Sequence, residues 1–270
     1  MKPIIESPFV QEVCAITSNM YRLGWDERNG GNISLWLDEG DVAPYLDLTK
    51  SGRKIALQFD AKEIAGALFL VTGTGKYFRN VAAHPEENLG VIRICPDGQS
   101  YEILWGLIPD SRPTSELPTH LMNHITRRKA DPDHRVVMHC HPTNLLAMTF
   151  VHSLDEREFT RTLWRTCTEC LVVFPDGVGV VPWMVCGNNA IGEKTAEKIV
   201  DRRAVVWAQH GLFCTGRDID ETFGLIETIE KAAEIYMKVL GHPVVQTITD
   251  DNLRQLAREF PAPARQGYLD

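Results

Sequence analysis

Two Pro-Asp-Gly triplets, at residues 96–98 and 175–177, constrain the fold most, because each lies between two short apolar runs. Proline presets the backbone for a turn and glycine accepts a positive φ, so such triplets favour tight connections between strands. The pattern predicts two β-hairpins, whose strands would span residues 90–95 and 100–105, and residues 171–174 and 178–182. Hairpins in a chain that also carries helix patterns favour a mixed, mostly antiparallel sheet covered by helices over a doubly wound parallel sheet.

Helix signals lie between the strand patterns. Ser7 and Pro8 predict a helix start, because serine caps a helix and proline fits its first position, and Gly24 predicts its end. Residues 38–67 are irregular and predict a peripheral excursion. The further helices that we expect span residues 113–129, 142–151, 156–166, 189–202, 218–240 and 250–260, and the further strands span residues 33–37, 67–71, 135–141 and 204–210.

Composition narrows the class of protein. The chain has 270 residues, 44% of them hydrophobic, and a formal net charge of -8, which favours a packed core and argues against a nucleic-acid surface. It has no apolar run of about 18 residues and no signal-peptide core at its start, so we expect neither a membrane span nor secretion. Its seven cysteines are scattered, which indicates reduced thiols and a cytoplasmic protein. The CxxC pair Cys167 and Cys170 lacks the second pair of a zinc ribbon, and we expect both side chains to be buried apolar groups.

The predicted strand at residues 135–141 ends in His139, Cys140 and His141. Side chains two apart on a strand point to the same face, so the two imidazoles can reach one ion while Cys140 points away. His210 follows another predicted strand and could supply a third ligand. Three histidines with an open fourth position form a catalytic zinc arrangement. Two polar residues at a strand end remain the alternative, because the spacing does not show that His210 folds back onto the pair.

Glu116, His120 and His124 are four residues apart and share one face of a predicted helix. They could form a second metal site, or the two histidines could belong to the core and make local hydrogen bonds, which is the interpretation we favour. We expect Glu116 in the first helical turn, at the positive end of the helix dipole. The carboxylate is then either favoured there by the dipole alone or faces the metal as a general base.

Three stretches suit an anion. Residues 29–32 read Asn-Gly-Gly-Asn, residues 72–76 read Thr-Gly-Thr-Gly-Lys, and Thr114 and Ser115 open a predicted helix. Backbone N–H groups in such turns and at helix starts can bind a phosphate, although the P-loop spacing is absent. Three such turns in one acidic chain favour a small phosphorylated substrate over a polyanion.

Together these motifs resemble the class II aldolase/adducin family. Longer stretches at residues 24–32, 104–107, 169–179 and 220–226 resemble its bacterial members, and the resemblance covers nearly the whole chain, weakening after about residue 245. It implies a single catalytic domain over residues 1–270 with three αβα layers, in which helices cover both faces of a mixed, mostly antiparallel sheet. It also implies a homotetramer with sites near the subunit interfaces.

The activity that this resemblance implies is the reversible cleavage of L-rhamnulose 1-phosphate to dihydroxyacetone phosphate and L-lactaldehyde, in L-rhamnose catabolism. One Zn²⁺ per subunit would be bound by residues that match the family's ligands, His139, His141 and His210. Glu116 matches the catalytic acid/base, and Glu169 matches a second acidic residue near the aldehyde half. The residues that fall where the family binds phosphate and nearby oxygens are Asn29, Asn32, Thr74, Gly75, Thr114 and Ser115. Thr74 stands where a serine is expected and keeps the hydroxyl.

Elementary chemistry agrees with this hypothesis. Cleavage of a C–C bond beside a carbonyl leaves an enediolate, whose charge a zinc ion would stabilise as a Lewis acid without a lysine Schiff base. Glu116 would remove and return the proton on the carbon that becomes nucleophilic. The alternatives are an L-fuculose 1-phosphate aldolase, a sugar-phosphate 4-epimerase of the same family, a non-catalytic scaffold as in the adducin branch, and a hydrolase that uses zinc-bound water.

Overall fold

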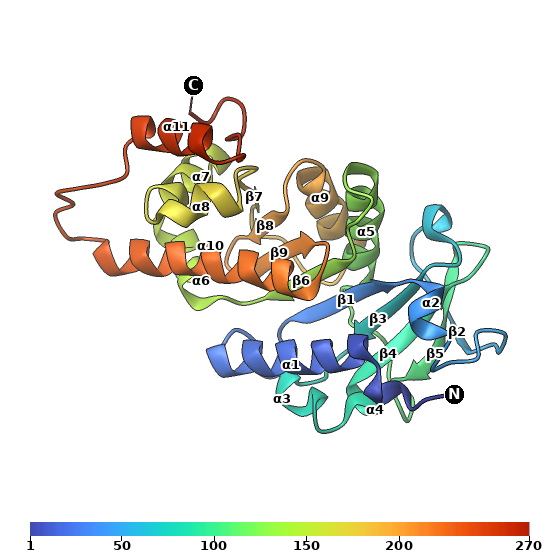
Figure 1. Cartoon of the computed structure of the whole chain (residues 1–270). Coiled ribbons are helices and arrows are strands. Elements are labelled where there is room, and N and C mark those ends of the chain that lie inside the picture. Colours follow the sequence, from blue (N-terminus) through green and yellow to red (C-terminus); the bar gives the residue numbers. More distant parts are fainter. Residues whose placement is uncertain (270) are drawn as a thin grey trace.

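The computed structural model describes residues 1–269, and nine strands among them form one continuous sheet (Figure 1). The strand order is β2-β5-β4-β3-β1-β6-β9-β8-β7, and every neighbouring pair is antiparallel except β7 and β8. The strands are β1 Asn32–Leu37, β2 Arg53–Ala56, β3 Leu68–Thr72, β4 Leu89–Ile94, β5 Ser100–Gly106, β6 Val136–Cys140, β7 Val178–Val181, β8 Ala204–Trp207 and β9 Gly211–Gly216.

Helices cover both faces of this sheet (Figure 1). Val136, Met138 and Cys140 of β6 pack into the main core with side chains of α1 and α10, whereas Val137 packs on the opposite face with Ile191 of α9. The mixed, mostly antiparallel sheet with helices on both faces is therefore confirmed. The helices are α1 Pro8–Leu23, α2 Glu39–Val42, α3 Phe78–Val81, α4 Pro85–Asn88, α5 Leu117–Ala130, α6 Thr143–Val151, α7 Glu156–Trp164, α8 Thr168–Val173, α9 Asn189–Ile199, α10 Ile219–Val239 and α11 Asp250–Glu259, with 3-10 turns at Ile4–Glu6 and Lys62–Ile64. Within residues 1–269, none of the helices has the length and apolar character that crossing a bilayer requires.

Helix α1 follows its sequence signals. The Ser7 hydroxyl accepts a hydrogen bond from the backbone N–H of Val10, Pro8 is the first helical residue, and Gly24 ends the helix at φ 77°. The buried stripe faces the main core.

One of the two predicted hairpins is confirmed and the other is wrong. Residues 96–98 connect the antiparallel strands β4 and β5, as predicted. Residues 171–174 form no strand, because residues 168–173 are helix α8 and Phe174 continues its pattern by donating to the carbonyl of Cys170 at 3.0 Å. Cys170, Leu171 and Phe174 are buried along one side of the helix, and an apolar run of four residues does not distinguish this from a strand. Residues 175–177 therefore connect α8 to β7, which pairs in parallel with β8.

Two other strand assignments need correction. The strand predicted for residues 204–210 ends at Trp207, and His210 lies in the turn that leads into β9, a strand that the sequence pattern did not suggest. The excursion at residues 38–67 contains the edge strand β2, which pairs only with β5 among the described strands. That strand is short and largely exposed, so it lacks the alternation that would have marked it.

Candidate active site

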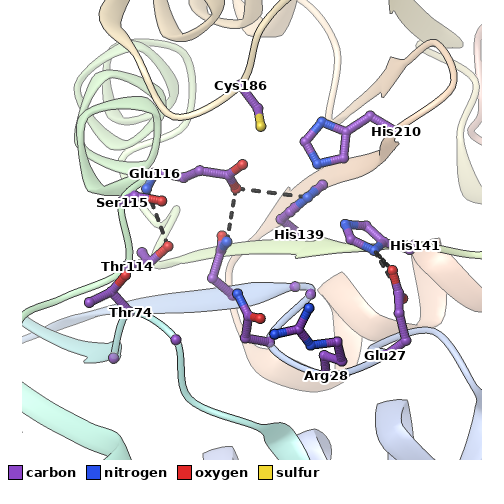
Figure 2. Close-up of a pocket in the computed structure, with 16 residues that line it drawn as sticks. Glu27, Arg28, Thr74, Thr114, Ser115, Glu116, His139, His141, Cys186 and His210 are labelled. Carbon is purple, nitrogen blue, oxygen red and sulfur yellow. Dashed lines mark hydrogen bonds and ion pairs between the residues drawn. The ribbon is translucent and has the colours of Figure 1, made fainter.

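A pocket of about 330 Å³ lies where the start of β1, the end of β6 and the start of α5 meet (Figure 2). It is lined by the turn after α1, the turn after β3, the segment before α5 and the three histidines. Ten of the eleven residues predicted for the site line this pocket: Asn29, Asn32, Thr74, Gly75, Thr114, Ser115, Glu116, His139, His141 and His210.

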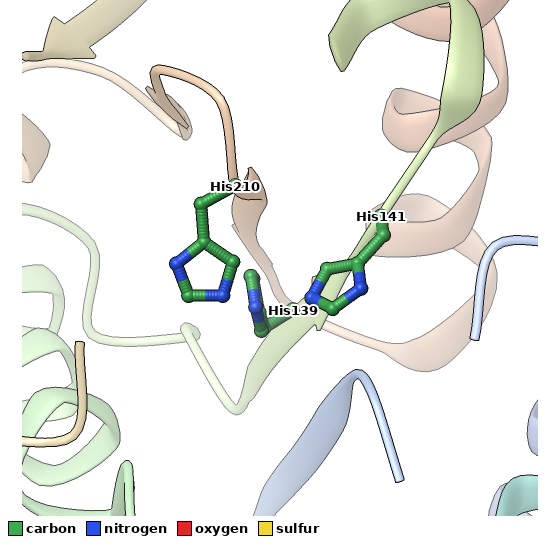
Figure 3. Close-up of side chains that lie close together, drawn as sticks. All are labelled: His139, His141 and His210. Atoms are coloured by element: carbon green, nitrogen blue, oxygen red, sulfur yellow. The ribbon is translucent and has the colours of Figure 1, made fainter. Parts of the chain in front are cut away.

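The three histidines converge on one point (Figure 3). One ring nitrogen from each of His139, His141 and His210 lies within 4.8 Å of the other two. His139 and His141 share a face of β6 as strand alternation predicts, while Cys140 between them is fully buried in the main core. His210 reaches them because β9 pairs with β6 and brings the preceding turn alongside.

The hydrogen bonds of His139 and His141 leave each ring with one nitrogen that could bind a metal ion. His139 Nδ1 lies 3.1 Å from the backbone carbonyl of Leu212, and His141 Nδ1 lies 3.0 Å from the Glu27 carboxylate. An N–H at Nδ1 donates in both bonds and leaves Nε2 with a free lone pair. Nε2 of both rings is buried without a hydrogen-bond partner among the described residues. Acceptors behind the ligating nitrogens are typical of metal sites, so the donor set fits a metal ion.

The pKa values of His139 and His210 also suit the binding of a metal ion. Burial, followed by the neighbouring His141 and His210, lowers the pKa of His139 well below its usual value. Burial and His141 lower the pKa of His210 to about 4. Both imidazoles are therefore neutral near pH 7, which is the form that binds metal ions.

Glu116 lies beside the histidines. Its Oε2 is 3.8 Å from His139 Nε2 and accepts a hydrogen bond from the Asn32 side-chain amide at 2.8 Å. Burial raises the pKa of Glu116 to about 7, and the Asn32 hydrogen bond opposes that shift. Glu116 is the N-cap residue of α5 rather than a residue of the predicted first turn, and its carboxyl group makes no capping hydrogen bond. A carboxyl with a pKa near neutrality beside a metal site can take up and return a proton.

His120 and His124 do not join a metal cluster. Among the described residues that could group around an ion, the candidate sets are the three histidines and a second set of Glu116, Cys186 and His210. His120 and His124 are fully buried and both bond to the Ser34 hydroxyl, at 2.7 and 2.8 Å. The prediction that they are core histidines with local hydrogen bonds is confirmed.

Two of the segments predicted to bind an anion lie side by side. Thr74 donates its backbone N–H to the carbonyl of Arg112 at 2.8 Å, and Gly73 forms a β-bridge with Pro113. This pairing places the turn after β3 next to the segment that carries Thr114 and Ser115. Lys76 lies outside the pocket lining, and among the described lining residues Arg28 is the one cationic side chain.

The turn between α1 and β1 is packed tightly under the pocket. The backbone N–H of His141 donates to the carbonyl of Trp25 at 2.8 Å. Gly31 has φ 74°, and a Cβ at this position would lie 1.7 Å from the buried Asp26 carboxylate and 2.9 Å from the His139 carbonyl. A glycine is therefore required where this turn crosses β6.

Glu169 is the predicted site residue that the fold does not bring to the pocket. It is exposed on α8, where the Cys167 thiol bonds to its carboxylate at 2.7 Å and lowers its pKa. Cys170 is buried as expected and Cys167 is half-buried.

Three further pocket residues were not assigned a role from the sequence. Glu27 and Arg28 belong to a stretch that was noted only for its resemblance to the family, and the Glu27 carboxylate bonds to the ring of His141. Cys186 is exposed at the pocket edge, in a loop where no sequence signal marked it.

Comparisons with known proteins agree with this geometry. Residues 11–237 match the family described as Class II Aldolase and Adducin N-terminal domain. A rhamnulose-1-phosphate aldolase from Listeria monocytogenes serotype 4b is 56% identical over 270 residues, which cover 100% of this chain and 99% of that protein. A protein of the same name from Klebsiella pneumoniae is 50% identical over 273 residues, with 100% and 99% covered. A crystal structure of a sugar-phosphate aldolase from Thermotoga maritima has a TM-score of 0.75 at 31% identity and covers 88% of this chain and 97% of its own.

Proposed function

The chain belongs to the class II aldolase and adducin family, and we propose that it is a lyase that reversibly cleaves L-rhamnulose 1-phosphate to dihydroxyacetone phosphate and L-lactaldehyde in L-rhamnose catabolism. The observation that carries the proposal is the convergence of three histidines, Glu116 and the anion-binding turns on one pocket. Full-length relatives named for this activity at 50% and 56% identity support the choice of substrate.

His139, His141 and His210 would hold one Zn²⁺ per subunit. The buried, unpartnered Nε2 atoms of His139 and His141 and the neutral imidazoles of His139 and His210 support a metal of this kind. When bound, the ion supplies Lewis-acid stabilisation of the negative charge that develops beside the carbonyl during cleavage.

Glu116 would act as the acid/base. It removes the proton from the carbon that becomes nucleophilic in the aldol direction and returns it after cleavage. A pKa of about 7 suits both halves of that cycle, because the group then exchanges its proton near neutral pH. The Asn32 amide holds one carboxylate oxygen at 2.8 Å and so limits the orientation of the group.

The turns would bind and orient the phosphate. Asn29, Thr74 and Gly75 line one part of the pocket and Thr114 and Ser115 line the next. Backbone N–H groups and hydroxyls suit a phosphate, and Arg28 adds a positive charge. Holding the substrate in one geometry can contribute roughly 7–11 kcal/mol of barrier lowering.

The unit of function would be a single catalytic domain over residues 1–270 that assembles as a homotetramer with sites near its interfaces. The continuous nine-stranded sheet supports the single domain. Glu169 lies outside the pocket of its own chain, so its catalytic role requires the pocket of a neighbouring copy.

A panel of ketose 1-phosphates, tested with and without a chelator, decides between the candidate reactions. We expect L-rhamnulose 1-phosphate to release dihydroxyacetone phosphate and free aldehyde, faster than L-fuculose 1-phosphate, and chelation to abolish the release until zinc is restored. An epimerase would release no aldehyde, and a hydrolase would release inorganic phosphate. Full cleavage by a His139→Ala variant would contradict the metal-dependent proposal.

A further inference from the structure

A continuous chain of buried hydrogen bonds runs from Glu116 into the protein, away from the pocket. Asn32 bonds to Glu116 with its amide nitrogen and to His120 Nε2 with its amide oxygen. The histidine chain, as we name it, continues through Ser34 and His124 to His134, with lengths of 2.7, 2.8 and 3.0 Å for its last three bonds. Every member is at most 6% exposed.

The repeat lengths of a strand and a helix produce this ladder. Asn32 and Ser34 lie two apart on β1 and face α5, while Ile33 and Leu35 face the main core. Two strand residues rise about 6.6 Å and four helical residues about 6 Å, so side chains on the two elements stay in step. Trp36 continues the strand row, and the guanidinium of Arg128 covers its ring at 4.3 Å.

The bonds of the histidine chain run in one direction. The Asn32 amide nitrogen can only donate and an ionised Glu116 can only accept, so the Asn32 oxygen faces His120 and accepts a hydrogen bond from its Nε2–H. Burial lowers the pKa of His120 to about 3, so the ring is neutral and its Nδ1 carries no proton.

That unprotonated Nδ1 fixes the remaining bonds. It must accept from the Ser34 hydroxyl, whose oxygen then accepts from His124 Nε2, and His124 Nδ1 accepts from His134 Nε2. The order leaves His134 Nδ1 unprotonated, and this buried atom has no hydrogen-bond partner among the described residues. The histidine chain therefore ends without an N–H group that lacks an acceptor.

We propose that the histidine chain positions the Asn32 side chain in the active site. The hydrogen bond from His120 to the Asn32 oxygen fixes the orientation of the amide, so that the N–H of Asn32 points at the Glu116 carboxylate. The proposal rests on the proposed role of Glu116 as the acid/base. His120 does not itself line the pocket, and it makes no hydrogen bond to His139, His141 or His210. It therefore acts through its bond to the pocket residue Asn32, as a positioning residue. Without this bond, Asn32 can turn its oxygen toward the carboxylate and withdraw the donor.

Two substitutions of His120 separate this role from a structural one. In His120→Gln the side-chain nitrogen can replace Nε2 and donate to Asn32, whereas His120→Asn is shorter and can reach only Ser34. We expect His120→Asn to lose about 10–100-fold in kcat, with KM and zinc content unchanged, and His120→Gln to recover most of the loss. Thr160→Val is the matched control, because it removes a buried 3.0 Å hydrogen bond far from the pocket. A wild-type kcat in His120→Asn, or equal losses in both variants, would overturn the proposal.

A measurement on the unmodified enzyme tests the direction of the chain directly. In zinc-loaded protein labelled with ¹⁵N-histidine, we expect His120, His124 and His134 to carry their single proton on Nε2. A proton on Nδ1 of any of the three overturns the proposal, whether or not the variants fold. This result does not depend on a substrate, so an enzyme that cleaves no ketose 1-phosphate but has this nitrogen pattern would contradict the proposed function and not the ordered chain.

Discussion

The carboxyl group of Glu116 is subject to two opposing influences. Burial removes water from the ionised form and raises its pKa to about 7, and the hydrogen bond from Asn32 favours the ionised form. Burial dominates because a single neutral donor at 2.8 Å replaces only part of the lost hydration. Glu116 therefore stays protonated up to about neutral pH, and its ionisation at higher pH lowers the free energy of unfolding.

This effect gives a pH-dependent prediction for the metal-free protein. The folded pKa of about 7 exceeds the ordinary value of 4.5, so the stabilisation is complete below pH 4.5 and is lost as the pH rises through 7. Relative to Glu116→Gln, chelator-treated wild type should lose up to about 3 kcal/mol of unfolding free energy between pH 5 and 8. Urea unfolding of both proteins at several pH values measures the difference. A difference that stays constant across this range would show that Glu116 titrates normally.

Cys186 allows a test of which side chains hold the metal. It forms an alternative cluster with Glu116 and His210, so the pocket offers two donor sets that share one histidine. We expect Cys186→Ser to keep its zinc through dialysis against a weak chelator and His139→Ala to lose it, because His139 belongs only to the histidine set. Zinc content measured after dialysis decides, and the reverse outcome would assign the metal to the Cys186 cluster.

At the scale of elements, the sequence was sufficient to predict a helix or strand where its structure depends on residues that are neighbours in the chain. Ser7, Pro8 and Gly24 predict α1 because capping is a property of neighbouring residues. The pairing of His139 with His141 also followed from strand alternation alone. The sequence did not predict α8 as a helix, because an apolar run is buried equally well in either conformation.

Contacts between elements that lie far apart in the chain could not be predicted from the sequence. Ser34 became informative only when β1 lay against α5, since its partners His120 and His124 are 86 and 90 residues away. The position of His210 depends on the pairing of β9 with β6, and no local pattern marks β9. Ten of the eleven predicted site residues nevertheless line one pocket, because the family resemblance supplied the long-range grouping that spacing could not.

The β8–β9 turn gives a prediction at this scale. A Cβ on Gly211 would lie 2.5 Å from the Cys140 carbonyl and 2.7 Å from the His139 ring, so β9 must move away from β6. We expect Gly211→Ala to lose about 1–3 kcal/mol of stability and to bind zinc more weakly. The control is Gly224→Ala in α10, where a Cβ meets nothing within 4 Å and the helix should be unchanged or stabilised. Unaltered zinc affinity in Gly211→Ala would show that the turn adapts.

For the whole molecule, the position of Glu169 predicts that two copies complete one site. Glu116→Ala and Glu169→Ala should each be inactive as pure proteins. If Glu169 serves a neighbouring pocket, oligomers reassembled from both variants contain sites in which one copy supplies Glu116 and the next supplies Glu169. Cleavage activity should therefore return on mixing after denaturation and refolding. Mixed oligomers that stay inactive would place the function of Glu169 within its own chain or outside catalysis.

The position of the pocket at the centre of the sheet has a consequence for folding during translation. Its walls come from residues 27–32, 73–75 and 114–116 and from His139, His141, Cys186 and His210, so they are spread over most of the chain. A ribosome that has released the first two hundred residues has produced β1, β3, α5 and β6 but not the third histidine. The proposed metal site is consequently completed only when β9 adds to β6, and a prematurely terminated chain carries only two of its three proposed ligands.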